Sequence, residues 1–192
     1  MTSIGQPQFP HFSFEEYLEK DSRSNEKLEY LHVVVYAMPG GTQFHNAIGM
    51  NFALVLAPQL RGKDCRVMSS DQMLETPGQE AGYYPDLLVV CGVRLLPRAA
   101  AMTAPVLVLE VLSPSTKAYD LGQKLQQYRR IPSLRHIVFV DSSRVEVQIY
   151  TRGTDEVWPG TPETLTELTD SLVLAAFGAD IPLREVYSDI DF

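Results

Sequence analysis

A chain of 192 residues in which 45% are hydrophobic and 21% are charged has the balance of a globular protein and can bury a substantial core. This balance excludes a disordered chain, and no apolar run approaches the ~20 residues that a membrane span requires. We therefore expect one domain over residues 1–192, irregular or frayed at residues 1–12, and no membrane partner.

The N-terminus and the cysteines favour a cytoplasmic protein. Residues 1–6 lack the basic start and apolar core of a secretion signal. Cys65 and Cys91 have no metal-ligand spacing, and the default for two such cysteines in a cytosolic protein is reduced, buried thiols. The four histidines are scattered and form no zinc pattern.

The net charge of −8 is unfavourable for binding nucleic acid, but it is unevenly distributed. Residues 94–144 contain eight basic and three acidic residues, whereas the residues after Arg144 contain ten acidic and two basic ones. Phosphate binding responds to local charge more than to the total, so the central segment is a candidate phosphate-binding patch. Ordinary scatter of solvated charge explains the same counts equally well.

The N-terminal part is predicted to contain a helix, a strand and a second helix. Ser13 and Glu16 have the spacing of a capping box, which indicates a short helix. Residues 28–38 include a β-branched run that predicts a strand, ended by the Pro-Gly-Gly that follows. Thr42 is a suitable N-cap for the next helix, which extends to Pro58. Its core face is formed by apolar residues at helical spacing, namely Phe44, Ile48, Phe52, Val55 and Leu56.

The rest of the chain is dominated by strands. Residues 66–70 read as a strand followed by a loop up to Gly82. The runs at 83–90 and 105–112 are apolar throughout, as in strands covered on both faces. A helix then extends to about Arg130, and Ile131-Pro132 ends it.

Residues 136–140 and 144–150 are predicted to form a hairpin, because only a short polar turn separates them. An apolar piece at 172–177 and a possible short helix at 183–187 follow. This order of elements predicts a mixed α/β domain with a central mixed sheet flanked by helices.

Two carboxylates lie in apolar runs that read as core strands. Glu110 lies inside 106–112, and Asp86 opens the apolar run that continues to Val90. An ionised carboxylate in such a position is costly unless it is protonated, paired or bound to a metal. Two acids placed in this way predict a single site for a hard cation.

Lys124 is a third candidate, because it borders an inward-facing helical stripe formed by Leu121, Leu125 and Tyr128. A short loop joins the strand of Glu110 to this helix, so all three side chains are expected at one end of the sheet. Two carboxylates holding Mg²⁺ or Mn²⁺ beside a lysine suit hydrolysis of a phosphodiester. The alternative is a simple i,i+4 pair of Lys124 with Asp120, worth ~0.3 kcal/mol.

A compound motif surrounds these residues. Its segments, in chain order, are Tyr84-Pro85-Asp86, Leu109-Glu110-Val111-Leu112-Ser113-Pro114-Ser115-Thr116, Tyr119-Asp120, Gly122, Lys124, Tyr128-Arg129-Arg130 and Pro132-Ser133-Leu134. This motif resembles that of the Uma2 family, restriction-endonuclease-like proteins of the PD-(D/E)XK nuclease superfamily. The resemblance extends from about Glu29 to Tyr150.

The resemblance implies a restriction endonuclease-like core and a Mg²⁺- or Mn²⁺-dependent endonuclease that acts on DNA as a homodimer. Asp86 and Glu110 correspond to the two acids of the superfamily and, with Val111, to its metal ligands. Lys124 corresponds to the catalytic lysine, displaced onto the helix, and Glu29 matches an acidic position that serves as a further ligand or a water organiser.

Some residues depart from the family pattern or remain open. Leu112 stands where the wider superfamily places its lysine, which motivates the alternative of a catalytically inactive binding or scaffold protein that retains the fold. A family Ile-Asp-Gly turn is replaced by Leu31-His32-Val33. His45 reads as a structural histidine more readily than as a base. Tyr128, Arg129 and Arg130 suit contacts to a phosphate backbone, but basic residues at an exposed helix end suit the helix dipole equally well.

Overall fold

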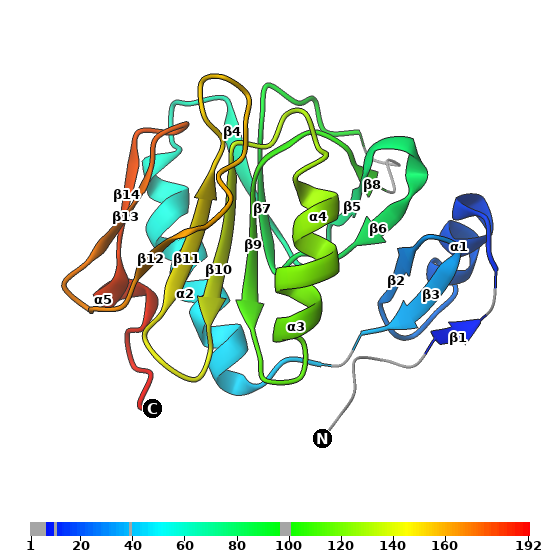
Figure 1. The fold of residues 1–192 in the computed structure, drawn as a ribbon, viewed down its shortest axis with the longest axis horizontal. Helices are drawn as coiled ribbons and strands as arrows, with labels where there is room; N and C mark the ends of the chain where they lie inside the picture. The colour runs from blue at the N-terminus through cyan, green and yellow to red at the C-terminus, as the bar shows by residue number, and fades with distance from the viewer. Residues whose placement is uncertain (1–6, 10, 39, 97–100) are drawn as a thin grey trace.

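The strands of the described residues form two six-stranded sheets and a two-stranded hairpin. The computed structural model describes residues 7–9, 11–38, 40–96 and 101–192. Its helical segments, which include a 3-10 turn (η1) and a π-helical turn (η2), are shown in Figure 1: α1 (Phe14–Asp21), α2 (Gln43–Gln59), η1 (Pro77–Gln79), α3 (Lys117–Tyr119), η2 (Asp120–Lys124), α4 (Leu125–Tyr128) and α5 (Leu183–Val186).

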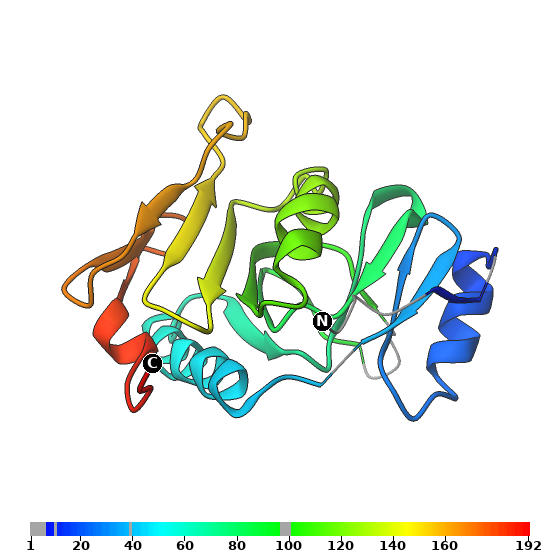
Figure 2. The same ribbon diagram turned by 60° about the horizontal axis from the view of Figure 1, so that its bottom comes forward.

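The central sheet is mixed and has helices on both faces. Its strands, in spatial order, are β12 (Glu163–Leu165), β11 (Val147–Thr151), β10 (His136–Asp141), β9 (Pro105–Leu112), β7 (Leu87–Cys91) and β4 (Cys65–Ser69). β9 and β10 pair in parallel, and the other neighbours pair antiparallel. α2 lies against one face, and α3 with α4 lies against the other (Figures 1 and 2). The predicted central mixed sheet flanked by helices is confirmed.

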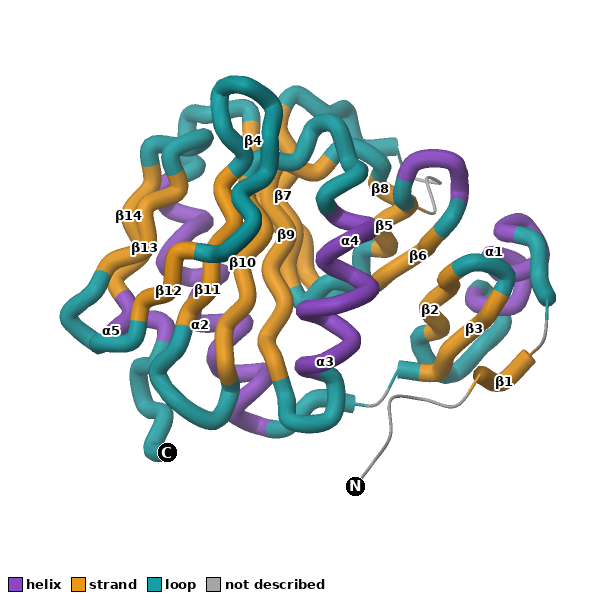
Figure 3. The backbone as a smooth tube through the Cα atoms, in the orientation of Figure 1, coloured by secondary structure: helices purple, strands orange, loops and turns teal. Residues whose placement is uncertain are grey.

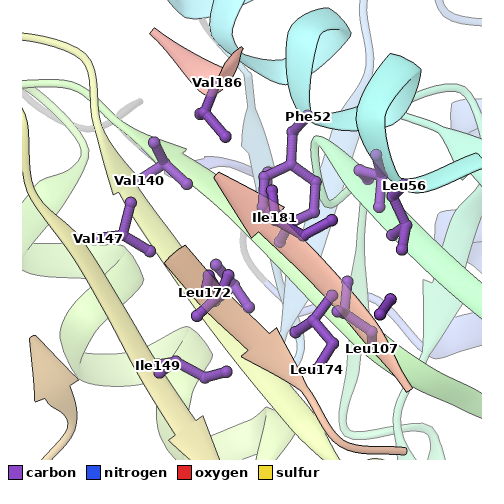
Figure 4. Close-up of a cluster of buried hydrophobic side chains, with 14 of the residues drawn as sticks. Phe52, Leu56, Leu107, Val140, Val147, Ile149, Leu172, Leu174, Ile181 and Val186 are labelled. Carbon is purple, nitrogen blue, oxygen red and sulfur yellow. The ribbon is translucent and has the colours of Figure 1, made fainter. Parts of the chain in front are cut away.

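Each face of this sheet packs on its own apolar core. Along β9, Leu107 and Leu109 belong to the core under α2, whereas Val108 and Leu112 belong to the core under α4. The first core is closed by a hairpin of two strands, β13 (Ser171–Leu174) and β14 (Ala179–Pro182). Figure 4 shows Phe52 of α2 and the hairpin side chains meeting those of the sheet. Burial on both faces explains why the run of β9 is continuous rather than alternating.

The second sheet was not predicted. Its strands, in spatial order, are β1 (Pro7–Phe9), β3 (Val34–Ala37), β2 (Leu28–Leu31), β6 (Ala81–Tyr83), β5 (Met73–Glu75) and β8 (Ala101–Met102). The predicted single strand at 28–38 is wrong, because His32 and Val33 adopt positive φ angles of 44° and 70° and reverse the chain. Positive φ is uncommon for residues other than glycine, so the residue types here give no turn signal, although the family places its Ile-Asp-Gly turn at this position.

Two further expectations fail in the same sheet. The predicted loop before Gly82 contains the short strands β5 and β6, which pair with each other. The N-terminal segment predicted to be irregular contains the strand β1, which pairs with β3. The remainder of the prediction for residues 1–6 and 10 lies outside the described residues.

The helix starts follow the sequence closely. Ser13 and Glu16 form the predicted capping box of α1. Thr42 caps α2 through a hydrogen bond from the backbone N–H of His45 to its side chain. Phe44 departs from the predicted core face: it is 40% exposed and its ring lies near that of Phe192. No helix in the described part of the chain is long and apolar enough to cross a membrane.

The helix predicted to end near Arg130 is present but is not a regular α-helix. Figure 3 shows α3 and α4 as one continuous helical segment beside β9, and the π-helical turn η2 joins them. The predicted hairpin is confirmed in β10 and β11, and the predicted short helix near the C-terminus is α5.

The expectation of two reduced thiols is wrong. Cys65 on β4 lies directly opposite Cys91 on β7, and the two form a disulfide with a Cα–Cα distance of 4.0 Å. Both side chains are half-buried. A separation of 26 residues says nothing about which strand β4 pairs with, so the sequence alone does not reveal this contact.

His136 is a buried histidine that uses both ring nitrogens. Nε2 accepts a hydrogen bond from the backbone N–H of Ala176, and Nδ1 lies 3.1 Å from Thr151 Oγ1. An Nε2 that accepts must be unprotonated, so the ring is neutral with its proton on Nδ1. Burial lowers the pKa of His136 from 6.5 to about 4.

We expect His136 to limit stability in acid. The unfolded chain takes up this proton near pH 6.5 and the folded chain only near pH 4, so the stability is complete above pH 6.5 and is lost as the pH falls towards 4. The loss is about 3 kcal/mol. Urea unfolding between pH 7 and pH 4 is expected to be less pH-dependent in His136→Gln, whereas His32→Asn, which changes a largely exposed histidine, keeps the wild-type slope. An unchanged slope in His136→Gln would contradict this assignment.

Candidate active site

The pairing of β7 with β9 brings the two predicted acids together. Leu87 is paired with Leu109 in an antiparallel register, so Asp86 and Glu110 continue that register on opposite strands. Side chains of directly opposed residues point to the same face of a sheet. Glu110 therefore shares its face with Val108, on the side of the sheet that α3 and α4 cover.

A cleft of about 670 Å³ opens at this end of the sheet. The N-terminus of α2, the loop after β9 and the turn η2 border it, and its lining includes Asp86, Glu110, Val111, Asp120 and Lys124. Four of the five predicted site residues thus reach one cleft.

Lys124 lies at the centre of a buried ionic cluster. Its Nζ is 3.0 Å from Glu29 Oε1, 3.1 Å from Glu110 Oε1 and 3.5 Å from Asp120 Oδ1. Its side chain is 1% exposed, so the contact with Asp120 is not the surface pair that helical spacing alone would produce. The ammonium is instead surrounded by carboxylates behind the cleft.

The turn η2 explains why Asp120 belongs to this cluster. A π-helical turn is wider than an α-helical one, and such turns are frequent at functional sites. Both ends of this turn, Asp120 and Lys124, are buried. From the sequence, Asp120 is expected only as an i,i+4 partner of Lys124 and not as a member of the site. The available signal was its i,i+4 spacing from a lysine already placed on the inward face.

Glu29 is the predicted site residue that does not line the cleft. It is fully buried, and its Oε1 accepts hydrogen bonds from Lys124 and from the backbone N–H of Tyr84. Oε2 has no hydrogen-bond partner among the described residues. The structure therefore places Glu29 against the lysine rather than against the space where a substrate would bind.

Of the residues at 128–130, the tyrosine binds an acid of the cleft and the two arginines are engaged elsewhere. Tyr128 is buried and donates a hydrogen bond to Glu110 Oε1. The guanidinium of Arg129 lies 4.7 Å from the centre of the Tyr150 ring, and Arg130 pairs with Glu80 on the loop before β6. Neither arginine lines the cleft.

Other basic residues of the central segment are also paired with acids. Lys117 Nζ lies 2.7 Å from Asp141 Oδ2, and Arg144 Nη2 lies 2.7 Å from Glu146 Oε2. Arg135 contacts Glu156 at 2.5 Å. The acidic residues that follow Arg144 therefore neutralise part of the local basic excess, which favours the interpretation of scattered, paired charge.

The cluster carries an excess of negative charge. Glu29, Glu110 and Asp120 surround the Lys124 ammonium and Asp86 lines the same cleft, so four carboxylates, when all are ionised, outnumber the one lysine charge that three of them contact. Burial raises the pKa of Glu110 well above its usual range, and it also raises that of Asp120. Burial alone would lower the pKa of Lys124, but Glu110 and Glu29 outweigh it and raise that pKa well above its usual range. A divalent cation would relieve this imbalance.

Among the described residues, one carboxylate oxygen of Glu110 and one of Asp86 accept no hydrogen bond. Lys124 and Tyr128 both donate to Glu110 Oε1, and Val111 N and His45 Nε2 both contact Asp86 Oδ2. Among the described residues, Glu110 Oε2 and Asp86 Oδ1 have no hydrogen bond. Two carboxylate oxygens of this kind are the ligands that Mg²⁺ and Mn²⁺ prefer.

No group of three or more His, Cys, Asp or Glu side chains in the described residues is arranged to hold a metal by itself. This arrangement still fits Mg²⁺, which commonly binds through one or two carboxylates and completes its shell with water and substrate phosphate. Val111 lines the same cleft, and its N–H is used by Asp86.

Comparison with known proteins identifies the family. The model of the family described as "Uma2: Putative restriction endonuclease" matches residues 14–183. The chain belongs to the Uma2 family. Among its relatives is "Uncharacterized protein slr1290" of Synechocystis, 34% identical over 184 residues, which covers 96% of this chain and 95% of the relative. "Uncharacterized protein sll1609" of the same organism is 29% identical over 155 residues, which covers 80% and 85%.

A solved structure supports the fold of this Uma2 protein. The crystal structure described as "a putative nuclease belonging to DUF820" from Anabaena variabilis superimposes with a TM-score of 0.74 and covers 92% of this chain and 98% of that one. The identity of 16% restricts the likeness to the fold. The expected restriction endonuclease-like core is therefore confirmed. The family description suggests a nuclease.

Proposed function

We propose that this Uma2 protein is a Mg²⁺- or Mn²⁺-dependent endonuclease that hydrolyses phosphodiester bonds in DNA. The observation that carries the proposal is the pair Asp86 and Glu110, opposed across β7 and β9, each with one uncommitted oxygen at the same cleft. The nuclease description of the family supports the reaction class.

In this proposal each residue has a separate task. Asp86 and Glu110 hold the cation, with Val111 as a third ligand. When bound, a divalent cation would polarise the phosphate and make a neighbouring water more acidic. Lys124 directs the attacking water and offsets the negative charge that develops on the phosphorus centre. Its raised pKa keeps it an ammonium, so it acts as a hydrogen-bond donor rather than as a base. Glu29 holds the ammonium in place.

A non-catalytic binding or scaffold role is the second candidate. Leu112, at the position of the superfamily lysine, is 1% exposed and packs in the core under α4. In addition, three carboxylates already surround Lys124. A protein that keeps the fold and binds nucleic acid without cutting it would have both features. Assembly as a homodimer and a cytoplasmic location remain predictions for either candidate.

The test is a cleavage assay on circular plasmid DNA and on a single-stranded RNA, each with Mn²⁺, with Mg²⁺ and with EDTA. We expect nicked or linear plasmid with either metal and intact plasmid with EDTA. Cleavage of the RNA alone would show that the substrate is wrong. Intact substrates at all metal concentrations, together with saturable Mn²⁺ binding, would favour the scaffold role.

A further inference from the structure

His45 lies where the N-terminus of α2 meets the candidate active site. Its backbone N–H is bound by the N-cap Thr42, which fixes the first turn of the helix. Its imidazole Nε2 lies 3.2 Å from Asp86 Oδ2, and the two side chains are 18% and 20% exposed. A residue from α2, on the far face of the central sheet, therefore reaches a proposed metal ligand at the end of β7.

The contact constrains the Asp86 carboxylate. Val111 N donates to the same oxygen, Oδ2, at 2.7 Å. An ionised carboxylate only accepts hydrogen bonds, so the Nε2 of His45 carries the proton. Two donors from different directions on Oδ2 fix the rotation of the carboxylate and leave Oδ1 for the cleft.

The two glycines before Thr42 differ in what a side chain would meet. A Cβ on Gly41 would lie 2.6 Å from His45 Nδ1 and 3.0 Å from its Cγ, so the imidazole would have to move. A Cβ on Gly40 would have nothing within 4 Å. The absence of a side chain at position 41 is therefore what lets the ring lie where it does.

His45 and His136 differ in the partners of their ring nitrogens, and this difference favours a positioning role for His45 over a structural one. His136 is tied to the fold through both nitrogens. The Nδ1 of His45 is buried without a hydrogen-bond partner among the described residues, and the polar contact found for its ring is the one to Asp86. The imidazole of His45 therefore binds the Asp86 carboxylate and, unlike that of His136, does not tie two parts of the fold together.

We propose that His45 is a positioning residue that holds Asp86 ready for the cation, and that Gly41 provides the space for it. This inference rests on the proposed function, because it assumes that Asp86 is a metal ligand. Loss of a hydrogen-bond partner of a metal ligand typically weakens metal affinity about 10–100-fold.

The experiment is calorimetric titration of Mn²⁺ into wild type and four variants, each checked for folding by thermal unfolding. His45→Leu removes the donor, and Gly41→Ala displaces the ring without changing it. Both are expected to raise the dissociation constant about 10–100-fold. His45→Gln keeps an N–H donor and is expected to recover part of the affinity. Gly40→Ala, one residue away in open space, is the matched control and is expected to bind as wild type does.

The outcomes distinguish this inference from the proposed function. Wild-type affinity in folded His45→Leu and Gly41→Ala would overturn the positioning role and leave the metal site intact. Absence of Mn²⁺ binding by the wild type would reject the metal site and this inference with it. If His45→Leu does not fold, the difference between Gly41→Ala and Gly40→Ala decides.

Discussion

The double variant Asp86→Asn/Glu110→Gln is expected to lose saturable Mn²⁺ binding and at least about 100-fold of its cleavage rate. Both substitutions keep the size of the side chain but remove the negative oxygens that the cation requires. A metal contributes several kcal/mol to the stabilisation of a phosphoryl transition state, and about 3 kcal/mol corresponds to a 100-fold change. Calorimetric titration measures the first effect and plasmid cleavage the second.

A buried acid outside the cleft is the matched control. Asp141 is 6% exposed and pairs with Lys117 of α3. Asp141→Asn therefore changes a buried carboxylate without touching the candidate site, and we expect normal Mn²⁺ binding. If the double variant binds Mn²⁺ with wild-type affinity, the cation site lies elsewhere.

Lys124→Met is expected to abolish cleavage and also to destabilise the protein by about 3–5 kcal/mol. The structural reason is that Glu29, Glu110 and Asp120 would lose the one cation they share in a buried setting. Removing one partner of a buried ion pair has a cost of this size, because the remaining charge is uncompensated. Urea unfolding measures the loss.

A second substitution separates catalysis from stability. In Lys124→Met/Glu29→Gln one negative charge leaves together with the positive one, so we expect part of the stability to return while cleavage stays absent. Arg23→Met, at an arginine that is 76% exposed and pairs with a 61% exposed Glu19, serves as the control and is expected to cost less than about 1 kcal/mol. Cleavage at the wild-type rate by the folded double variant would show that Lys124 has no part in the reaction.

Asp86 and Glu110 were predictable as a pair of buried acids because each lies in or beside a continuous apolar run that marks a core strand. A carboxylate in or next to an apolar run is easily found in a sequence, and the two apolar runs themselves predict the strands β7 and β9. The antiparallel pairing of these two strands, which puts Asp86 across from Glu110, comes from the structure and was not predicted. Helical spacing predicted that Lys124 borders the buried face of its helix, and the lysine is indeed buried, whereas its catalytic role was proposed from the family resemblance.

Other parts depended on backbone geometry that residue types do not encode. The turn at His32 and Val33 uses positive φ angles without a glycine, and this hid a hairpin of the second sheet. The π-helical turn that buries Asp120 has an ordinary composition. The disulfide depended on the pairing of an edge strand, and the role of Gly41 depended on the position of a ring four residues along the chain.

The buried excess of carboxylates has a thermodynamic consequence for the whole molecule. Like charges that desolvate together oppose folding, so the metal-free protein is less stable than its apolar cores alone would make it. A ligand that binds only the folded state raises the melting temperature in proportion to the logarithm of its concentration. The melting temperature of this protein would then rise with the concentration of divalent cation around it. Variants selected only for heat resistance would be expected to lose these acids first.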